Sequence, residues 1–182
     1  FCFENHPERE DGIISGAQDS IGICIPGLCR HYYDNHFWPD KIETCENENI
    51  LSWLENHLCM IPMEARRPGC SVVEGMDITK EKVVALTKAA DDCWNAILNT
   101  DLESFAKSYK ASFNAQVAMF PAMIQGCVQE YIDKYSVMED VLAWKMPGAG
   151  GGGYLACVVK DANEFCKKNN ESIKLKIRRS GF

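Results

Sequence analysis

The sequence predicts an α+β fold, in which an antiparallel sheet and helices on one of its faces form a two-layer sandwich. Short apolar runs, which are typical of strands, occupy residues 58–63, 141–145 and 154–160. A long stretch with helical spacing separates the first run from the second. Residues 173–177 then alternate apolar and basic side chains, as an exposed strand does. Strands and helices interleaved in this order predict two packed layers.

A first unit is predicted over residues 1–56, and a second over residues 57–182. The first unit begins with a polar, turn-rich loop. It continues with a short helix that Asp19 or Ser20 helps to start, and then with a two-stranded hairpin. The polar segment 46–56 is interpreted as the boundary or as a connecting helix.

Three helices are predicted between the first two strands of the second unit. Thr79 or Asp77 is expected to cap the first of them. The inward residues of this helix, spaced three and four apart, are predicted to be Val83, Leu86, Ala90, Cys93 and Ile97. Segment 100–103 matches a capping box, in which the Thr100 hydroxyl and the Glu103 side chain accept hydrogen bonds from unpaired amides at the start of the second helix. Pro121 is expected to open the third helix, and Asp161 to cap a later one.

Composition excludes several classes of function. The formal net charge of −7 argues against a surface for nucleic acid or anionic membranes, because phosphate groups are bound by clustered Lys and Arg. The apolar runs are shorter than the roughly 20 residues that span a bilayer. We therefore expect a cytoplasmic protein. The ten cysteines show no Cys-x-x-Cys spacing, lie mostly in apolar stretches and are interpreted as buried side chains rather than as metal ligands.

A glycine-rich turn lies between two predicted strands and comprises Gly148, Ala149, Gly150, Gly151, Gly152 and Gly153. Glycine weakens a strand, so a run of four requires a reason other than strand propensity. One interpretation is a loop whose bare main-chain N–H groups approach a phosphate. The alternative is a tight connection without a ligand. Neither a Walker A loop nor a dinucleotide fingerprint is present, because a strand follows the glycines.

Two further groups of residues are candidates for a site. Asp19, next to Gln18, is a candidate base or orienting group for a hydroxyl nucleophile. Its alternative role is an ordinary helix N-cap. Arg66 and Arg67 are candidates for binding a phosphate or carboxylate, and the alternative is a solvated turn.

Segment 145–154, Lys-Met-Pro-Gly-Ala-Gly-Gly-Gly-Gly-Tyr, resembles the third motif of the GHMP kinases, the superfamily of galactokinase, homoserine kinase, mevalonate kinase and phosphomevalonate kinase. Segment 16–20, Gly-Ala-Gln-Asp-Ser, is similar to the Gly-x-x-Asp-Gln segment that carries the catalytic Asp in sugar kinases of this superfamily, with Ser20 in place of Gln. The resemblance runs from about Gly16 to Val159. It is nearest to the heptose-phosphate kinase and fucokinase branch.

This resemblance implies a ferredoxin-like carboxy-terminal kinase domain at residues 57–182, preceded by a remnant of the amino-terminal domain. It implies ATP-dependent transfer of the terminal phosphoryl group to a hydroxyl of a sugar or sugar phosphate, with Mg²⁺ offsetting charge. Asp19 would accept or orient the hydroxyl proton. The turn from Gly148 to Gly153 would close on the phosphate site.

The ATP loop of that superfamily, Pro-x-x-x-Gly-Leu-x-Ser-Ser, does not occur in these 182 residues. Two alternatives follow: a sugar kinase represented by its carboxy-terminal portion, and a binding or interaction module that keeps the fold without catalysis. A portion of a kinase would associate with its missing amino-terminal half or form a homodimer, because apolar side chains would be exposed. Those side chains are Ile21, Ile23, Ile25, Phe37 and Trp38.

Overall fold

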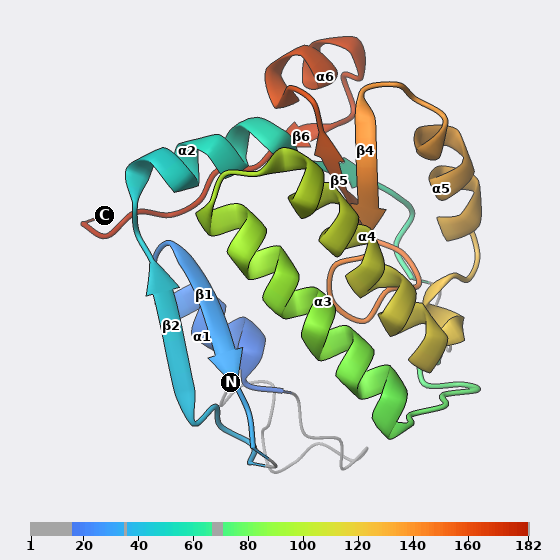
Figure 1. Cartoon of the computed structure of the whole chain (residues 1–182). Helices are drawn as coiled ribbons and strands as arrows, with labels where there is room; N and C mark the ends of the chain where they lie inside the picture. The colour runs from blue at the N-terminus through green and yellow to red at the C-terminus, as the bar shows by residue number, and fades with distance from the viewer. Residues whose placement is uncertain (1–15, 35, 67–70, 182) are drawn as a thin grey trace, which may run out of the picture. The chain divides into compact units, whose positions relative to one another are not determined.

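The computed structural model describes residues 16–34, 36–66 and 71–181 (Figure 1). The chain divides into two compact units, residues 1–51 with 177–182, and residues 52–176. The assignment of residues 1–56 to the end of a kinase's amino-terminal domain stays a prediction, and residues 1–15 lie outside the described part. Within that part, no helix is both long enough and apolar enough to cross a membrane.

The first unit contains helix α1 (Gln18–Cys24) and the antiparallel strands β1 (Leu28–Tyr32) and β2 (Lys41–Cys45). The predicted helix and hairpin are therefore confirmed. Gly27, with φ +75°, joins α1 to β1, and a Cβ there would lie 2.4 Å from the carbonyl oxygen of Cys45. Only glycine suits both the left-handed backbone and this close approach.

Helix α2 (Glu48–His57) follows and begins in the first unit. The Asn47 side chain accepts a hydrogen bond from the Asn49 amide at 3.0 Å, which satisfies one donor of the first turn. Glu48 forms an ion pair with Arg179 at 2.7 Å. The predicted connecting helix is confirmed.

The second unit contains a four-stranded antiparallel sheet with strand order β4-β5-β3-β6. Its strands are β3 (Leu58–Pro62), β4 (Val141–Lys145), β5 (Tyr154–Val159) and β6 (Ile173–Lys174). Its helices are α3 (Lys80–Leu98), α4 (Leu102–Met119), the short 3₁₀ helix η1 (Pro121–Met123), α5 (Val128–Ser136) and α6 (Ala162–Lys168). Counted in chain order, this strand arrangement is the ferredoxin-like one, and the predicted α+β fold is confirmed.

The core of the second unit joins the three longer strands to the helices. Strands β3 and β5 contribute alternate residues, because the side chains of a strand point to one face at every second position. The buried cluster consists of Cys59, Ile61, Phe113, Met123, Val128, Ile132, Tyr135, Val141, Met146, Leu155, Cys157, Val159, Ala162 and Phe165. Pro62 ends β3 beyond the reach of β6, as expected for a proline that cannot donate to a ladder.

Helices α3 and α4 run side by side (Figure 1), and the predicted inward stripe of α3 is partly wrong. Val83 is 44% exposed and Ala90 is also exposed, whereas Ala89 and Ala96 are buried. Small side chains seven residues apart let two helices approach closely, so the face that packs is marked by alanine rather than by valine.

The predicted capping box at residues 100–103 is wrong. Thr100 has φ +52° and its amide donates to the Ile97 carbonyl oxygen, so it ends α3 instead of starting α4. Asp101 caps α4 by accepting a hydrogen bond from the Ser104 amide at 3.0 Å. Thr79 and Asp161 cap α3 and α6 as predicted.

Two other expectations fail in detail. Pro121 opens only the three-residue η1, and α5 begins at Val128. The last strand spans two residues, Ile173 and Lys174, rather than 173–177. Ile173 is exposed there, while Lys174 is half-buried and donates to the side chains of Asn56 and Asn163, so the predicted orientation of the alternating side chains is reversed.

Candidate functional site

The glycine-rich turn connects β4 to β5 through backbone conformations that most residues do not adopt. Gly148, Gly150, Gly151, Gly152 and Gly153 all have positive φ, between +63° and +146°. L-residues with a Cβ rarely occupy this region, which accounts for the glycines before any ligand is considered.

The second half of the turn is held by the protein itself. The Gly151 amide donates to the Met123 carbonyl oxygen at 2.9 Å, and the Gly153 amide donates to the Glu64 carbonyl oxygen at 2.8 Å. A Cβ on Gly152 would lie 2.7 Å from the same Glu64 oxygen. Close packing against the segment after β3 therefore explains Gly151 and Gly152, as the interpretation without a ligand requires, whereas Gly153 has open space at its Cβ position and is explained by its φ of +91°.

The first half of the turn is different. Gly148 and Ala149 are exposed, and their amides make no hydrogen bond to any other residue that the structure describes. A Cβ on Gly148 would meet nothing within 4 Å, so packing does not demand a glycine there. Exposed main-chain N–H groups in a left-handed turn are the type of donor that binds anions.

The structure brings Arg66 to this turn. A Cβ on Gly151 would lie 3.1 Å from the Arg66 side-chain carbon Cδ, and one on Gly152 would lie 2.8 Å from the Arg66 backbone nitrogen. The Arg66 side chain is exposed and has no hydrogen bond or ion pair among the described residues. Two parts of the predicted phosphate site thus belong to one local structure: Arg66 packs against Gly151 and Gly152, and the exposed amides of Gly148 and Ala149 precede these glycines in the same turn.

The other predicted site residues are not joined to this group. Arg67 lies outside the described residues. Gln18 and Asp19 lie in the first unit, whereas Arg66 and the glycine-rich turn lie in the second, and their assembly into one site stays a prediction. Asp19 is exposed in the first turn of α1, where Ala17 rather than Asp19 occupies the N-cap position. The alternative role of Asp19 as an ordinary N-cap is therefore wrong.

Sequence reasoning gave no separate role to the lysine at the base of the turn. Lys145, the last residue of β4, donates from Nζ to the Ser112 hydroxyl of α4 at 2.6 Å. Burial lowers the pKa of the Lys145 ammonium, and Cys93 opposes this shift. A signal was present in the sequence, because strand alternation places Lys145 on the same face as the apolar residues Val141 and Ala143.

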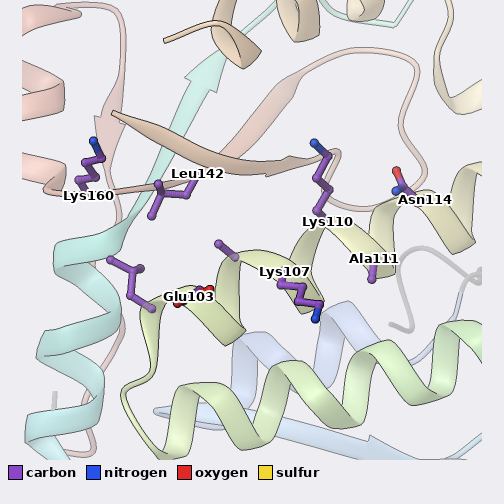
Figure 2. A pocket seen from close by; sticks show the side chains of 9 residues that line it. Glu103, Lys107, Lys110, Ala111, Asn114, Leu142 and Lys160 are labelled. Carbon is purple, nitrogen blue, oxygen red and sulfur yellow. The ribbon is translucent and has the colours of Figure 1, made fainter. Parts of the chain in front are cut away.

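A groove of about 700 Å³ runs along α4 beside β4. Figure 2 shows Lys107, Lys110 and Asn114 on successive turns of α4, with Leu142 on the facing strand. Lys110 lies over the Trp144 ring, with Nζ 4.1 Å from the ring centroid. The residues that line the groove are Leu102, Glu103, Ala106, Lys107, Lys110, Ala111, Asn114, Leu142 and Lys160.

Metal ligands do not gather in the part of the chain that the structure describes. No three side chains of His, Cys, Asp or Glu lie close enough there to hold an ion. Mg²⁺ in a kinase is commonly held by one or two carboxylates together with the substrate phosphates. The exposed amides and the guanidinium at the glycine-rich turn are hydrogen-bond donors, which suit an anion rather than a metal ion.

Comparisons with known proteins relate this chain to kinases by structure. No family model and no curated protein matches the sequence. A D-glycero-D-manno-heptose 1-phosphate kinase from Bacteroides thetaiotaomicron superposes with a TM-score of 0.60 at 16% identity, covering 96% of this chain and 50% of that one. A putative sugar kinase from Campylobacter jejuni gives 0.65 at 20% identity, with 96% and 52% covered. A mevalonate kinase gives 0.57 at 16% identity, with 78% and 46% covered.

At these identities the likeness concerns the fold, and the chain spans about half the length of the solved kinases. The second unit supplies the ferredoxin-like sheet and the glycine-rich turn at the place in the chain order that the sequence motif indicated. The predicted resemblance is therefore confirmed at the level of structure: the chain has the fold of the GHMP kinases over about half of their length.

Proposed function

We propose that this chain is the carboxy-terminal portion of a GHMP-type kinase that transfers the terminal phosphoryl group of ATP to a hydroxyl of a sugar or sugar phosphate. The observation that carries the proposal is the arrangement at the turn, where Gly151 and Gly152 pack against Arg66 and the preceding Gly148 and Ala149 have exposed amides. Two of the similar structures are described as a heptose 1-phosphate kinase and a putative sugar kinase. A sugar is therefore the substrate class that we favour.

Each residue has a distinct role in this proposal. The Gly148 and Ala149 amides and the Arg66 guanidinium bind phosphate oxygens and lower the cost of bringing negative charges together. Gly150 to Gly152 keep those amides in place by packing against Met123 and the segment after β3. Asp19 orients the hydroxyl of the sugar and accepts its proton, while Mg²⁺, held by the phosphates, offsets their charge.

Thermal unfolding with and without MgATP tests this proposal. A ligand at one hundred times its Kd raises the free energy of unfolding by about 2.7 kcal/mol, so we expect a clear rise in Tm. Arg66→Ala should reduce the rise, because it removes a charge that binds phosphate. Lys176→Ala is the matched control, since it removes an exposed cation that belongs neither to the turn nor to the segment after β3.

A sugar panel assayed for ADP release then identifies the acceptor. Asp19→Asn should abolish ADP release and leave the MgATP-dependent rise in Tm intact, because Asp19 is assigned to the hydroxyl and not to the nucleotide. The absence of any rise with MgATP in the unmodified chain would contradict nucleotide binding by these 182 residues.

A second function, binding without catalysis, is favoured by the groove along α4. Its lysines and apolar floor form a surface for an anionic partner that needs no nucleotide. The anionic aromatic probe 1-anilinonaphthalene-8-sulfonate tests this surface. Binding that is lost in Lys107→Glu with Lys110→Glu, in a chain that MgATP does not stabilise, would favour the binding module over the kinase.

A further inference from the structure

Two cysteine side chains from distant parts of the sequence touch inside the second unit. Cys59 is the second residue of β3, and Cys166 lies on α6. Their sulfur atoms are 3.6 Å apart, and the Cys59 thiol also points toward the Ala162 carbonyl oxygen at 3.9 Å. A disulfide bond is 2.03–2.05 Å long, so the sulfur atoms need to approach by only about 1.6 Å.

The two thiols differ in their access to solvent. Cys59 is fully buried, whereas Cys166 is half-buried. Burial raises the pKa of the Cys59 thiol, and contact with Cys166 adds to this shift. A soluble oxidant therefore reaches Cys166 first, and Cys59 is positioned to react with the oxidised sulfur of Cys166.

The surroundings favour closure of the pair. Lys174 donates to the side chain of Asn163 on α6 at 2.9 Å, and its ammonium lowers the pKa of Cys59 against the effect of burial. Helix α6 has seven residues, so a small shift of the helix disturbs few of its own hydrogen bonds. The contact thus joins a thiol accessible to solvent, a buried second thiol and a nearby cation.

We propose that Cys59 and Cys166 form a reversible disulfide when the protein meets a hydroperoxide. The Cys166 thiol loses its proton, and the thiolate attacks one peroxide oxygen, so that the O–O bond breaks and a sulfenic acid forms. With hydrogen peroxide, the departing hydroxide takes up the thiol proton and leaves as water. The Cys59 sulfur then attacks the sulfenic sulfur, its thiol proton leaves with the hydroxyl group as a second water, and the S–S bond forms. In sum, two thiols lose two hydrogens and one peroxide becomes two waters.

The cross-link has a structural consequence that does not depend on the proposed kinase function. It ties α6 to β3, the strand that leads into the Glu64 to Arg66 segment against which the glycine-rich turn packs. It also closes a loop of about 100 residues, the length range for which restriction of the unfolded chain stabilises most.

Peptide mapping of the full chain tests the proposal directly. The protein is treated with hydrogen peroxide under native conditions, its remaining thiols are alkylated, and the digest is examined by mass spectrometry. We expect a peptide pair joined through Cys59 and Cys166, lighter by two hydrogens than the sum of its thiols and lost on treatment with dithiothreitol. The oxidised protein should show a Tm higher by roughly 10 °C.

Two serine variants distinguish this pair from its neighbour. Cys157 stands opposite Cys59 in the register of β3 and β5, so it is the competing partner. Cys157→Ser should keep the cross-link and the rise in Tm, whereas Cys166→Ser should lose both. A peptide joining Cys59 to Cys157 would overturn the proposal. Conversion of Cys166 to sulfinic or sulfonic acid, with Cys59 still a free thiol, would overturn it as well.

Discussion

Lys145 carries an ammonium group into the packing between β4 and α4, where the Ser112 hydroxyl is its hydrogen-bond partner at 2.6 Å. A buried charge costs free energy unless it is paired, and replacement by an apolar side chain of similar length is often neutral or stabilising. We therefore expect Lys145→Met to leave the free energy of unfolding at pH 7 unchanged or higher by about 1 kcal/mol. Denaturant unfolding measures this difference.

The pH dependence of the same variant gives a second, independent check. Because burial lowers the pKa of Lys145, the unfolded chain holds this proton to higher pH than the folded protein does. The free-energy cost of burying the Lys145 charge is therefore fully present below the pKa of the folded protein. It disappears as pH rises toward the pKa of the unfolded chain, near 10.4. Relative to Lys145→Met, the unmodified protein should gain stability over that range. A parallel pH profile for the two proteins would contradict the assignment.

Ser112→Ala supplies the companion measurement for this residue. It removes the hydroxyl and leaves the ammonium without its hydrogen-bond partner, which costs about 1–3 kcal/mol for a buried polar group. Loss of stability in Ser112→Ala together with none in Lys145→Met would show that the unpaired charge, rather than the lost volume, is the costly feature.

At the scale of one element, the glycine-rich turn contains glycines required for two different reasons, close packing and a left-handed backbone. Gly152 has φ +146°, and a Cβ there would meet backbone atoms of Glu64 and Arg66 at 2.7 and 2.8 Å. Gly148 has φ +63° and open space around its Cβ position. We expect Gly152→Ala to destabilise by more than about 3 kcal/mol, and Gly148→Ala by only about 1–2 kcal/mol, the cost of a left-handed backbone.

Chemical denaturation of the two variants, with MgATP present and absent, checks this prediction. Equal losses of stability would mean that the turn can move away from the segment after β3, and that Gly152 is not held by packing. Because Gly148 is exposed, its alanine variant should fold and is the better one for asking whether the turn contacts phosphate.

The elements whose signals are local could be predicted from the sequence. Pro26 and Gly27 end a helix whatever lies around them, and Asp161 caps α6 as its residue type predicts. The apolar run of β5 and the glycine-rich turn likewise identified two strands and their connection. The fold class follows from the order of these elements, so the amino-acid sequence alone is enough to derive it.

The predictions that were wrong concern features that depend on how the elements pack against one another. Val83 and Ala89 each belong to a series of apolar residues spaced three and four apart in α3. Which of the two series is buried depends on how α3 packs against α4, which the sequence pattern does not show. Thr100 matched a capping pattern, yet the tight connection to α4 gives it a left-handed backbone and transfers the cap to Asp101. The candidate site shows the same limit, because the proximity of Arg66 to Gly151 and Gly152 joins residues far apart in the sequence.

At the scale of the whole molecule, three of the five apolar side chains predicted to be exposed in the first unit are exposed, namely Ile23, Phe37 and Trp38, whereas Ile21 and Ile25 are half-buried. Ile23 is 73% exposed and Trp38 is 52% exposed, and Phe37 packs edge to face against Trp38. Exposed groups of this size commonly mark a surface that binds another protein. We propose that this surface associates with a second copy of the chain or with the amino-terminal half of a kinase.

Sedimentation velocity over a range of concentrations measures this association. We expect the weight-average sedimentation coefficient to rise with concentration, and to rise further with added salt, because salt screens the repulsion between molecules of net charge −7 and leaves apolar attraction intact. Ile23→Ser with Trp38→Ser should restore a monomer. Val137→Ser, which removes an 82% exposed apolar side chain from the second unit, is the matched control. If Val137→Ser also gives a monomer, non-specific apolar association, rather than the surface of the first unit, causes the self-association. If the unmodified protein is a monomer at every concentration, it does not self-associate.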